Sequence, residues 1–322
     1  MTLPPGFPSR FATPEDYVLG ITREIWEERR IASLRGLYAD DLVVRSPASV
    51  VAGNGGIVAA TLSTLAEFPD RELPGEDVIW APVSQTAFLS SHRLLCWATH
   101  TAPGAYGAPT GRRLAYRIIA DCFCEGGAVR DEWLVRDQGA IVRQMGWDLE
   151  GWARLQVLRE GGPERCVKPF APDRDVAGPY EGEGFPTEET EEVAAALAAA
   201  LRGGAATEWD KGAELFGPGH RTAHGRSGAR RLWGRLGAAL PAGEFRVRHA
   251  IARRDPGLPP RVALRWSLDG THDGSGPFGA PTGAPLHVFG MTHAEIGPRG
   301  IRREWTLYDE AALWRQIVLA TG

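Results

Sequence analysis

Apolar positions recur at helical spacing at the start of each half of the chain. Near the N-terminus, Thr13 is placed to cap a helix and Pro14 to occupy its first position, and an apolar stripe follows. Residues 57–68 have the same helical character and end before a proline. In the second half, residues 188–204 and 227–240 repeat this order. The pattern predicts that helices come first in both halves.

After each helical region the pattern changes to alternation of apolar and polar residues. The alternation is clearest at residues 262–268, 286–296 and 301–308, and a helical segment at 310–319 closes the chain. Helices followed by a three- to four-stranded antiparallel meander predict the α+β class rather than a parallel doubly wound sheet. A curved sheet wrapped around helices forms a cone, and the interior of such a cone is the first place to look for a ligand.

A tandem repeat organises the chain. The sequence GAPTG occurs at residues 107–111 and again at 279–283, an offset of 172 residues. At the same offset the chain repeats a histidine, a Glu-Trp pair, an aspartate and an Arg-Gln pair. We therefore predict two copies of one module, the first at 12–158 and the second at 187–322. A linker at 159–186, rich in glycine and proline, joins them.

Composition limits the classes of protein that fit. Of the 322 residues, 43% are hydrophobic and 24% are charged, which is ordinary for a folded globular protein. The net charge of -4 and the lack of a basic patch argue against a nucleic-acid partner, and no apolar run approaches the ~18 residues of a membrane span. The N-terminal residues lack the apolar core of a secretory signal, and the four cysteines form no C-x-x-C pair. We expect a cytoplasmic protein with reduced thiols and no membrane partner.

The second module carries a recognisable motif. Residues 265–274 read RWSLDGTHDG, and residues 278–317 contain PTG, a glycine turn, I-x-x-x-W-x-x-x-D and a final Arg-Gln. This resembles the SnoaL-like polyketide cyclase (ester cyclase) family of the NTF2-like superfamily, and residues 98–111 and 129–145 of the first module are a weaker match. The resemblance implies two tandem NTF2-like cones, each with N-terminal helices packed on a curved antiparallel sheet. Because single modules of this fold commonly pair through their outer sheet faces, we expect an intramolecular pseudo-dimer, with a homodimer as the alternative.

The resemblance also implies a chemistry. Aldol cyclases of this family use neither metal nor cofactor, and they place an acid/base aspartate and a histidine in the cavity. Aligned through the shared motif, the aspartate falls on Thr306 and Leu134, and the histidine falls on Thr292 and Ala120. We therefore predict a cofactor-independent cyclase-, isomerase- or hydratase-like protein for a small, largely apolar organic molecule, from which the aldol-cyclase pair is lost.

Other functions stay open. The main alternative is a non-catalytic small-molecule binder or a structural pseudo-dimer, and a more distant one is epoxide hydrolysis that uses Arg265 with Glu304. His220 and His224 have the spacing of metal ligands on a helix, but they lie in a glycine-rich stretch. No glycine-rich phosphate loop follows a strand and opens a helix. We therefore expect neither a metal nor a cofactor.

The second module keeps the motif better, so we expect it to bind the ligand. A carboxyl group in an apolar cavity has a raised pKa and can exchange protons near neutral pH. The candidates for catalysis are Glu304, Asp309, His272 and His293. The candidates for ligand binding are Trp266, Thr292, Thr306, Tyr308, His287, Met291, His100, Asp121, Glu132 and Asp137.

Each candidate also has a structural interpretation. Asp137 and Asp309 precede helices and fit the N-cap position. His100 and His272 precede the GAPTG turns and fit a turn-stabilising role. His287, Met291 and His293 share one parity along a strand, opposite to that of Thr292, and the pattern leaves open which parity faces the cavity.

Overall fold

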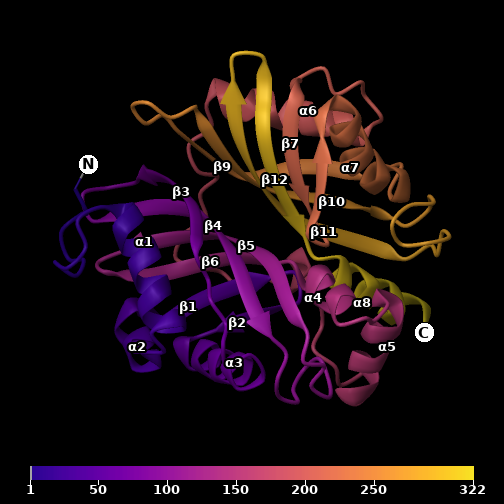
Figure 1. The fold of residues 1–322 in the computed structure, drawn as a ribbon, viewed down its shortest axis with the longest axis horizontal. Coiled ribbons are helices and arrows are strands. Elements are labelled where there is room, and N and C mark those ends of the chain that lie inside the picture. The colour runs from indigo at the N-terminus through magenta and orange to yellow at the C-terminus, as the bar shows by residue number, and fades with distance from the viewer. Residues whose placement is uncertain (1) are drawn as a thin grey trace.

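The computed structural model describes residues 2–322 and shows the same arrangement twice (Figure 1). The first module comprises α1 (Pro14–Thr22), the π-helical turn η1 (Arg23–Glu27), η2 (Ile31–Ser33), α2 (Leu34–Leu37), β1 (Tyr38–Ser46), β2 (Ser49–Ala52), α3 (Asn54–Glu67), β3 (Gly75–Pro82), β4 (Ala87–Thr99), β5 (Arg113–Glu125), β6 (Ala128–Arg136), α4 (Gln138–Gln144) and α5 (Leu149–Arg159). A linker with one short turn, η3 (Pro172–Arg174), follows. The second module comprises α6 (Glu188–Leu201), β7 (Trp209–Gly217), β8 (Arg221–His224), α7 (Gly225–Ala239), β9 (Glu244–Arg253), β10 (Arg261–Thr271), β11 (Pro285–Gly297), β12 (Gly300–Tyr308) and α8 (Glu310–Thr321).

Each module builds a six-stranded sheet with the same strand order. The orders are β2-β1-β6-β5-β4-β3 and β8-β7-β12-β11-β10-β9. The last four strands of each module form the antiparallel meander, whereas β1 pairs with β6 in parallel and β7 pairs with β12 in parallel. The predicted α+β class with two tandem NTF2-like cones is confirmed. The sheets are larger than expected because β1, β2, β7 and β8 lack regular alternation in the sequence.

Helices α1, α6 and α8 begin at the predicted residues, whereas α3 and α7 begin three and two residues before the predicted positions 57 and 227. The Thr13 side chain accepts a hydrogen bond from the backbone amide of Asp16 at the start of α1, and Thr187 with Thr190 forms a capping box on α6. Asp137 caps α4 and Asp309 caps α8, so the N-cap interpretation of both residues is confirmed. None of the helices within residues 2–322 has the length and apolarity that crossing a bilayer requires.

The outer faces of the two sheets pack against each other. Ile119 and Val135 of the first module meet Met291 and Leu307 of the second, and Phe170 of the linker joins the same apolar cluster. Strands β3 and β9 also lie side by side, and α8 packs against α4 and α5 of the first module (Figure 1). The expected intramolecular pseudo-dimer is therefore present in the fold.

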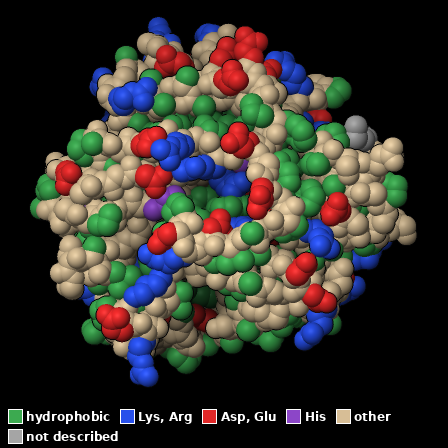
Figure 2. All heavy atoms as spheres, turned by 180° about the vertical axis from the view of Figure 1, so that it is seen from behind, with side chains coloured by type: hydrophobic (Ala, Val, Ile, Leu, Met, Phe, Trp, Pro, Cys, Tyr) green, Lys and Arg blue, Asp and Glu red, His purple; other side chains and the backbone are tan. Residues whose placement is uncertain are grey.

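The linker covers the seam between the modules. Tyr180 stacks on Phe123 with 5.0 Å between ring centroids, and Arg45 of β1 pairs with Asp131 and with Asp175 of the linker. Seen from behind, acidic and basic side chains are interspersed over the surface rather than gathered by sign (Figure 2). This distribution fits the small net charge of -4.

Candidate functional site

The cone of the second module is filled by tryptophan side chains. Trp209, Trp233 and Trp266 lie in the cone, and each is almost fully buried. The indoles of Trp209 and Trp233 donate to the two carboxyl oxygens of Glu304 at 2.7 and 2.8 Å. Burial raises the pKa of Glu304, while these bonds and one from Thr306 act against the rise. Glu304 is thus enclosed by donors of its own chain.

The remaining cone candidates of the second module belong to the same packed interior. The indole of Trp266 donates to Thr292 at 3.0 Å, and the hydroxyls of Thr292 and Thr306 lie 2.9 Å apart. Tyr308 packs edge-on against Trp266. Gly290 makes room for that indole, since a Cβ there would lie 2.2 Å from the Trp266 ring. The parity question is settled, because Thr292 faces the cone.

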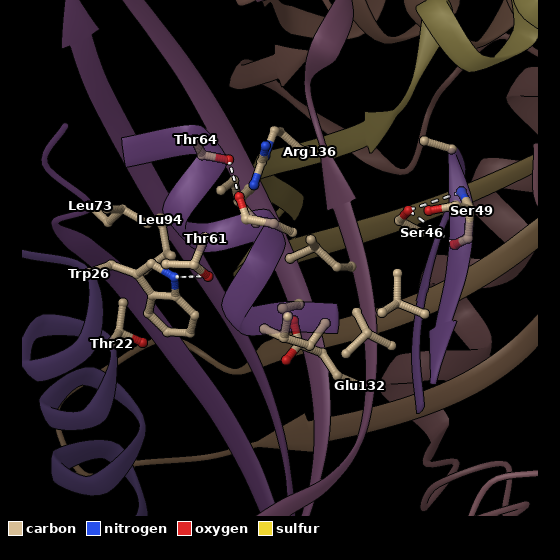
Figure 3. Close-up of a pocket in the computed structure, with 18 of the residues that line it drawn as sticks. Thr22, Trp26, Ser46, Ser49, Thr61, Thr64, Leu73, Leu94, Glu132 and Arg136 are labelled. Carbon is tan, nitrogen blue, oxygen red and sulfur yellow. Dashed lines mark hydrogen bonds between the residues drawn. The ribbon is translucent and has the colours of Figure 1, made fainter. Parts of the chain in front are cut away.

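The first module has an open cone instead. A cavity of about 280 Å³ lies between its helices and its sheet, close to the lower end of the usual range for small-molecule sites. Residues 172 positions apart pair identically in the two sheets, so the cones can be compared position by position. Thr61 and Leu94 stand where the second module has Trp233 and Trp266, and Tyr38 stands for Trp209. These smaller side chains leave the space open, and Trp26, bonded to Thr61 at 3.3 Å, borders it (Figure 3).

Glu132 is the carboxyl group that faces this cavity from β6. Apolar side chains of β1, β2, α3 and β5 line the cavity with it, namely Val44, Val51, Ile57, Ile118 and Ala120. Burial raises the pKa of Glu132 to about 7, although the hydroxyl of Tyr38 acts to lower it. A carboxyl group with this pKa is part protonated and part ionised at neutral pH, which suits proton exchange.

A histidine and two arginines share the cavity with Glu132. Burial lowers the pKa of His92 to about 4, so its ring is neutral, and its Nδ1 has no partner among the described residues. Arg71 follows α3, and Arg136 ends the strand that carries Glu132. Figure 3 shows Arg136 and Glu132 at separate places along the wall. The polar groups therefore stand at separate points of an otherwise apolar lining.

Asp309 joins the same cavity from the second module. Besides capping α8, it lines the wall of the first cone. Burial raises its pKa to about 8, and the charges of Asp137 and Glu310 add to the rise. The equivalent residue Asp137 accepts hydrogen bonds from the backbone amides of Gly219 and His220, each at 2.9 Å. Burial raises the pKa of Asp137 only to about 6, because these hydrogen bonds act to lower it.

The two hairpins explain this asymmetry. Between β7 and β8 the loop has three residues, Pro218 to His220, and two of their amides reach Asp137. Between β1 and β2 the loop has only Pro47 and Ala48, and within residues 2–322 it gives no hydrogen bond to Asp309. Asp309 is left facing the cavity.

Asp121 and His293 lie outside both cones, in contrast to their expected places. They meet in a buried polar cluster between the sheets, where Ser91 donates to Asp121 at 2.5 Å and lies 2.7 Å from His293 Nε2. Arg93 donates to His293 Nδ1 at 3.1 Å, and burial with this charge keeps the His293 pKa well below its usual value. His293 therefore donates to Ser91 from Nε2, which is the opposite polarity to a base that activates a serine.

Asp121 is ionised in this cluster. Burial acts to raise its pKa, but the hydrogen bond and charge of His249 and the charge of Arg265 outweigh burial. Arg265 also lies over Trp133, with 3.9 Å to the ring centroid. Arg265 and Glu304 are on opposite faces of the second sheet, so the pair proposed for epoxide hydrolysis is not assembled.

The other candidates stabilise the interface and the turns. Met291 lies in the apolar seam, and His287 pairs with Asp269 beside Phe170 of the linker. His100 and His272 are fully buried and bond Thr110 and Thr282 of the two GAPTG turns. In these positions neither histidine lines the first cone. Within residues 2–322, no group of three or more His, Cys, Asp or Glu side chains is placed to hold a metal ion.

A family model for the SnoaL-like polyketide cyclases matches residues 17–145 and, a second time, residues 205–317. The chain belongs to the SnoaL-like polyketide cyclase family. Both copies of the repeat are matched, so the weaker first module is a member of the family as much as the second. A comparison with curated proteins gave no match.

Solved structures similar to this SnoaL-like chain correspond to one module each. Wild-type IdmH from Streptomyces antibioticus is 22% identical over 41% of this chain and 98% of its own, with a TM-score of 0.36. TsrD from Streptomyces laurentii is 20% identical over 41% and 91%, with a TM-score of 0.34. A SnoaL-like polyketide cyclase from Agrobacterium tumefaciens is 23% identical over 41% and 99%, with a TM-score of 0.32.

Sequence reasoning did not single out Arg71, His92 or Arg136. None of them belongs to a motif, and an isolated histidine or arginine on a strand carries little signal. A signal exists in the repeat, because positions 92 and 136 hold His and Arg where the second module has Leu264 and Tyr308. A difference in polarity between the two copies of the SnoaL-like repeat therefore distinguishes the open cone from the filled one.

Proposed function

We propose that this protein is a cofactor-independent enzyme of the cyclase, isomerase or hydratase type, acting on a small, largely apolar organic molecule in the cavity of the first module. The observation that carries this proposal is Glu132, a carboxyl group with a pKa of about 7 in the wall of a cavity of about 280 Å³. A base poised near the working pH is the requirement for removing a proton from a carbon acid.

The proposed step uses two carboxyl groups. The ionised Glu132 takes a proton from a carbon next to a substrate carbonyl, and the bonding electrons move to the carbonyl oxygen as an enolate. In an isomerisation or an intramolecular aldol closure, one proton must then be delivered to the product carbon or alkoxide. Asp309, whose pKa is about 8, is protonated at neutral pH and supplies that proton. The neutral His92 donates or accepts a hydrogen bond without adding charge.

Glu132 and His92 lie next to the positions that the family's acid/base pair would occupy. Leu134 and Ala120 hold the positions that the resemblance assigns to the aspartate and the histidine. Glu132 lies two residues before Leu134, on the same strand and the same face. His92 lies directly opposite Ala120 on the neighbouring strand β4. Both groups therefore enter the cone next to the vacated positions.

A non-catalytic binder is the second candidate. The observation in its favour is that Leu134 and Ala120 make the two family positions apolar. In this case the cavity binds its ligand and Glu132 stays protonated beside it. The two candidates differ in whether bound carbon acids lose a proton.

The experiment uses 5-nitrobenzisoxazole, a small apolar compound whose ring opens with a colour change when a base removes its carbon-bound proton. We expect ring opening above the buffer rate, rising with pH with a midpoint of about 7, and lost in Glu132→Gln. Glu304→Gln is the matched control, because it changes the equivalent carboxyl group in the filled cone. Binding of the compound without ring opening would support the non-catalytic binder instead.

A further inference from the structure

Arg71 and Arg136 are the two cationic groups of the first cavity, and neither is neutralised by an ion pair. Among residues 2–322, no carboxylate oxygen lies within 4.0 Å of either guanidinium, and the side-chain hydrogen bond that Arg71 makes is to the neutral hydroxyl of Tyr116. The Nε atoms of both are buried without a partner. Buried arginines are usually paired, because an unpaired charge is costly to desolvate.

The carboxyl groups of the cavity do not cancel these charges. Asp309 acts on Arg136, but its pKa of about 8 leaves it mostly neutral at pH 7. Glu132, with a pKa of about 7, is only part ionised. Burial lowers the pKa of Arg71, yet a guanidinium stays protonated at neutral pH. A ligand in this cavity therefore meets two guanidiniums that no carboxylate of the protein pairs with, which favours an anionic ligand group.

The second module shows that the fold does not need these arginines. Tyr308 stands at the position of Arg136, and Gly243 stands 172 residues after Arg71. In that cone the interior is closed by indoles and hydroxyls that satisfy one another. Two unpaired guanidiniums in the open cone, and none at the equivalent places of the filled one, indicate a role toward a ligand.

We propose that the first cavity binds an apolar organic acid, whose carboxylate is held by Arg71 and Arg136 while its hydrocarbon body lies toward Glu132. The proposal rests on the use of this cavity as the substrate site and adds the chemical class of the substrate. A planar carboxylate matches the fork of N–H donors that a guanidinium presents. Residues 132 and 136 are about 13 Å apart along the strand, so several bonds separate the carboxylate from the reacting carbon.

The test compares 2-naphthoate with 2-naphthamide, which has the same shape and no charge, by calorimetry at pH 7. We expect the naphthoate to bind about tenfold or more tightly, because its hydrogen bonds are to charged donors. Arg136→Met and Arg71→Met should each remove this preference, and Arg136→Lys should keep part of it. Arg35→Met, at an exposed position of α2, removes the same charge and should leave the preference unchanged.

Thermal unfolding separates a ligand role from a structural one. Because neither arginine forms an ion pair within the protein, Arg136→Met and Arg71→Met should leave the melting temperature of the unliganded protein unchanged or raise it. A fall in melting temperature with no change in the naphthoate preference would assign the arginines to the fold and overturn the proposal.

The binding result also keeps the two proposals apart. Equal binding of naphthoate and naphthamide would overturn the acid-binding inference and leave the proposed chemistry of Glu132 standing. No binding of either compound would overturn both, since the cavity would then not accept a molecule of this size.

Discussion

The two modules share a strand order, a buried glutamate at the same position and a helix-capping aspartate, yet only one has an open cone. The second module places Trp209, Trp233 and Trp266 where the first places Tyr38, Thr61 and Leu94. The same carboxyl group is consequently enclosed by indoles in one copy and faces a cavity in the other. A motif match describes the fold, while the volume of a few side chains decides whether the fold can bind a ligand.

Fusion of two copies explains how one cone could close. The outer sheet faces of the two modules bury each other's apolar side chains within one chain. The second module can therefore cover the outer face of the first even though its own cone is filled. It also contributes α8 and Asp309 to the first module. The second module therefore contributes Asp309 to the lining of the first cavity.

The largest contrast is expected from the two glutamates. Glu132→Gln should lower turnover of the carbon-acid probe by about 10²- to 10⁴-fold, the usual contribution of a general base. Glu304→Gln should leave turnover unchanged and cost about 1–3 kcal/mol of stability, because an amide nitrogen would face an indole donor. The two variants are compared by probe kinetics and urea unfolding, and the reverse ranking would assign the chemistry to the second module.

The tryptophans of the filled cone should be stabilising. Trp266→Leu, which copies the first module's residue, removes a buried ring and its bond to Thr292, and we expect a loss of about 2–4 kcal/mol, somewhat less than truncation of a tryptophan to alanine costs. Leu94→Ala, at the equivalent position beside an existing cavity, should cost less. Equilibrium unfolding in urea measures both, and a Trp266→Leu variant as stable as the native protein would contradict a filled cone.

Filling the open cone should abolish binding. Thr61→Trp introduces the residue that the second module has at this position, and we expect binding of 2-naphthamide to weaken by about a hundredfold or more. Thr61→Val, which removes only the hydroxyl bonded to Trp26, is the control and should bind almost normally. Unchanged binding in the tryptophan variant would place the ligand elsewhere.

Stability should depend on the protonation of Glu132. Its pKa is about 7 in the folded protein and near 4.5 when unfolded, so the folded state holds the proton more tightly. Stability therefore falls as pH rises from about 4.5 through 7, by about 3 kcal/mol for this group. In Glu132→Gln this part of the fall should be missing. Urea unfolding of both proteins at pH 5 and pH 8 measures the difference, and parallel pH profiles would show that Glu132 is not buried in this way.

The smallest expected effect concerns Asp309. If Asp309 supplies the proton to the product, the rate of isomerisation should decline above about pH 8, because Asp309 then loses that proton. Asp309→Asn should lower this rate by about tenfold and remove the decline. Asn is also a good N-cap, so α8 should form normally. Asp137→Asn is the matched control, since Asp137 caps α4 but does not line the cavity. Equal effects of the two substitutions would point to a shared structural role.

Sequence predicted the repeat, the α+β class, the helix caps and the meander strands, because these depend on local periodicity and capping chemistry. It missed β1 and β7, whose parallel partners lie far away in the chain and whose patterns are irregular. Glu132 was among the ligand-binding candidates, but the better motif favoured the second module. Which cone is open depends on the strand face that Trp266 occupies and on its packing over Gly290, and neither can be read from one strand alone.

The most direct test is a crystal of the protein soaked with 2-naphthamide, whose neutral charge makes the outcome independent of the two arginines. The account predicts ordered ligand in the first cone, in contact with Thr61, Leu94 and Glu132, and an unchanged set of indoles around Glu304 in the second. Ligand bound among Trp209, Trp233 and Trp266, with the first cone empty, would contradict it.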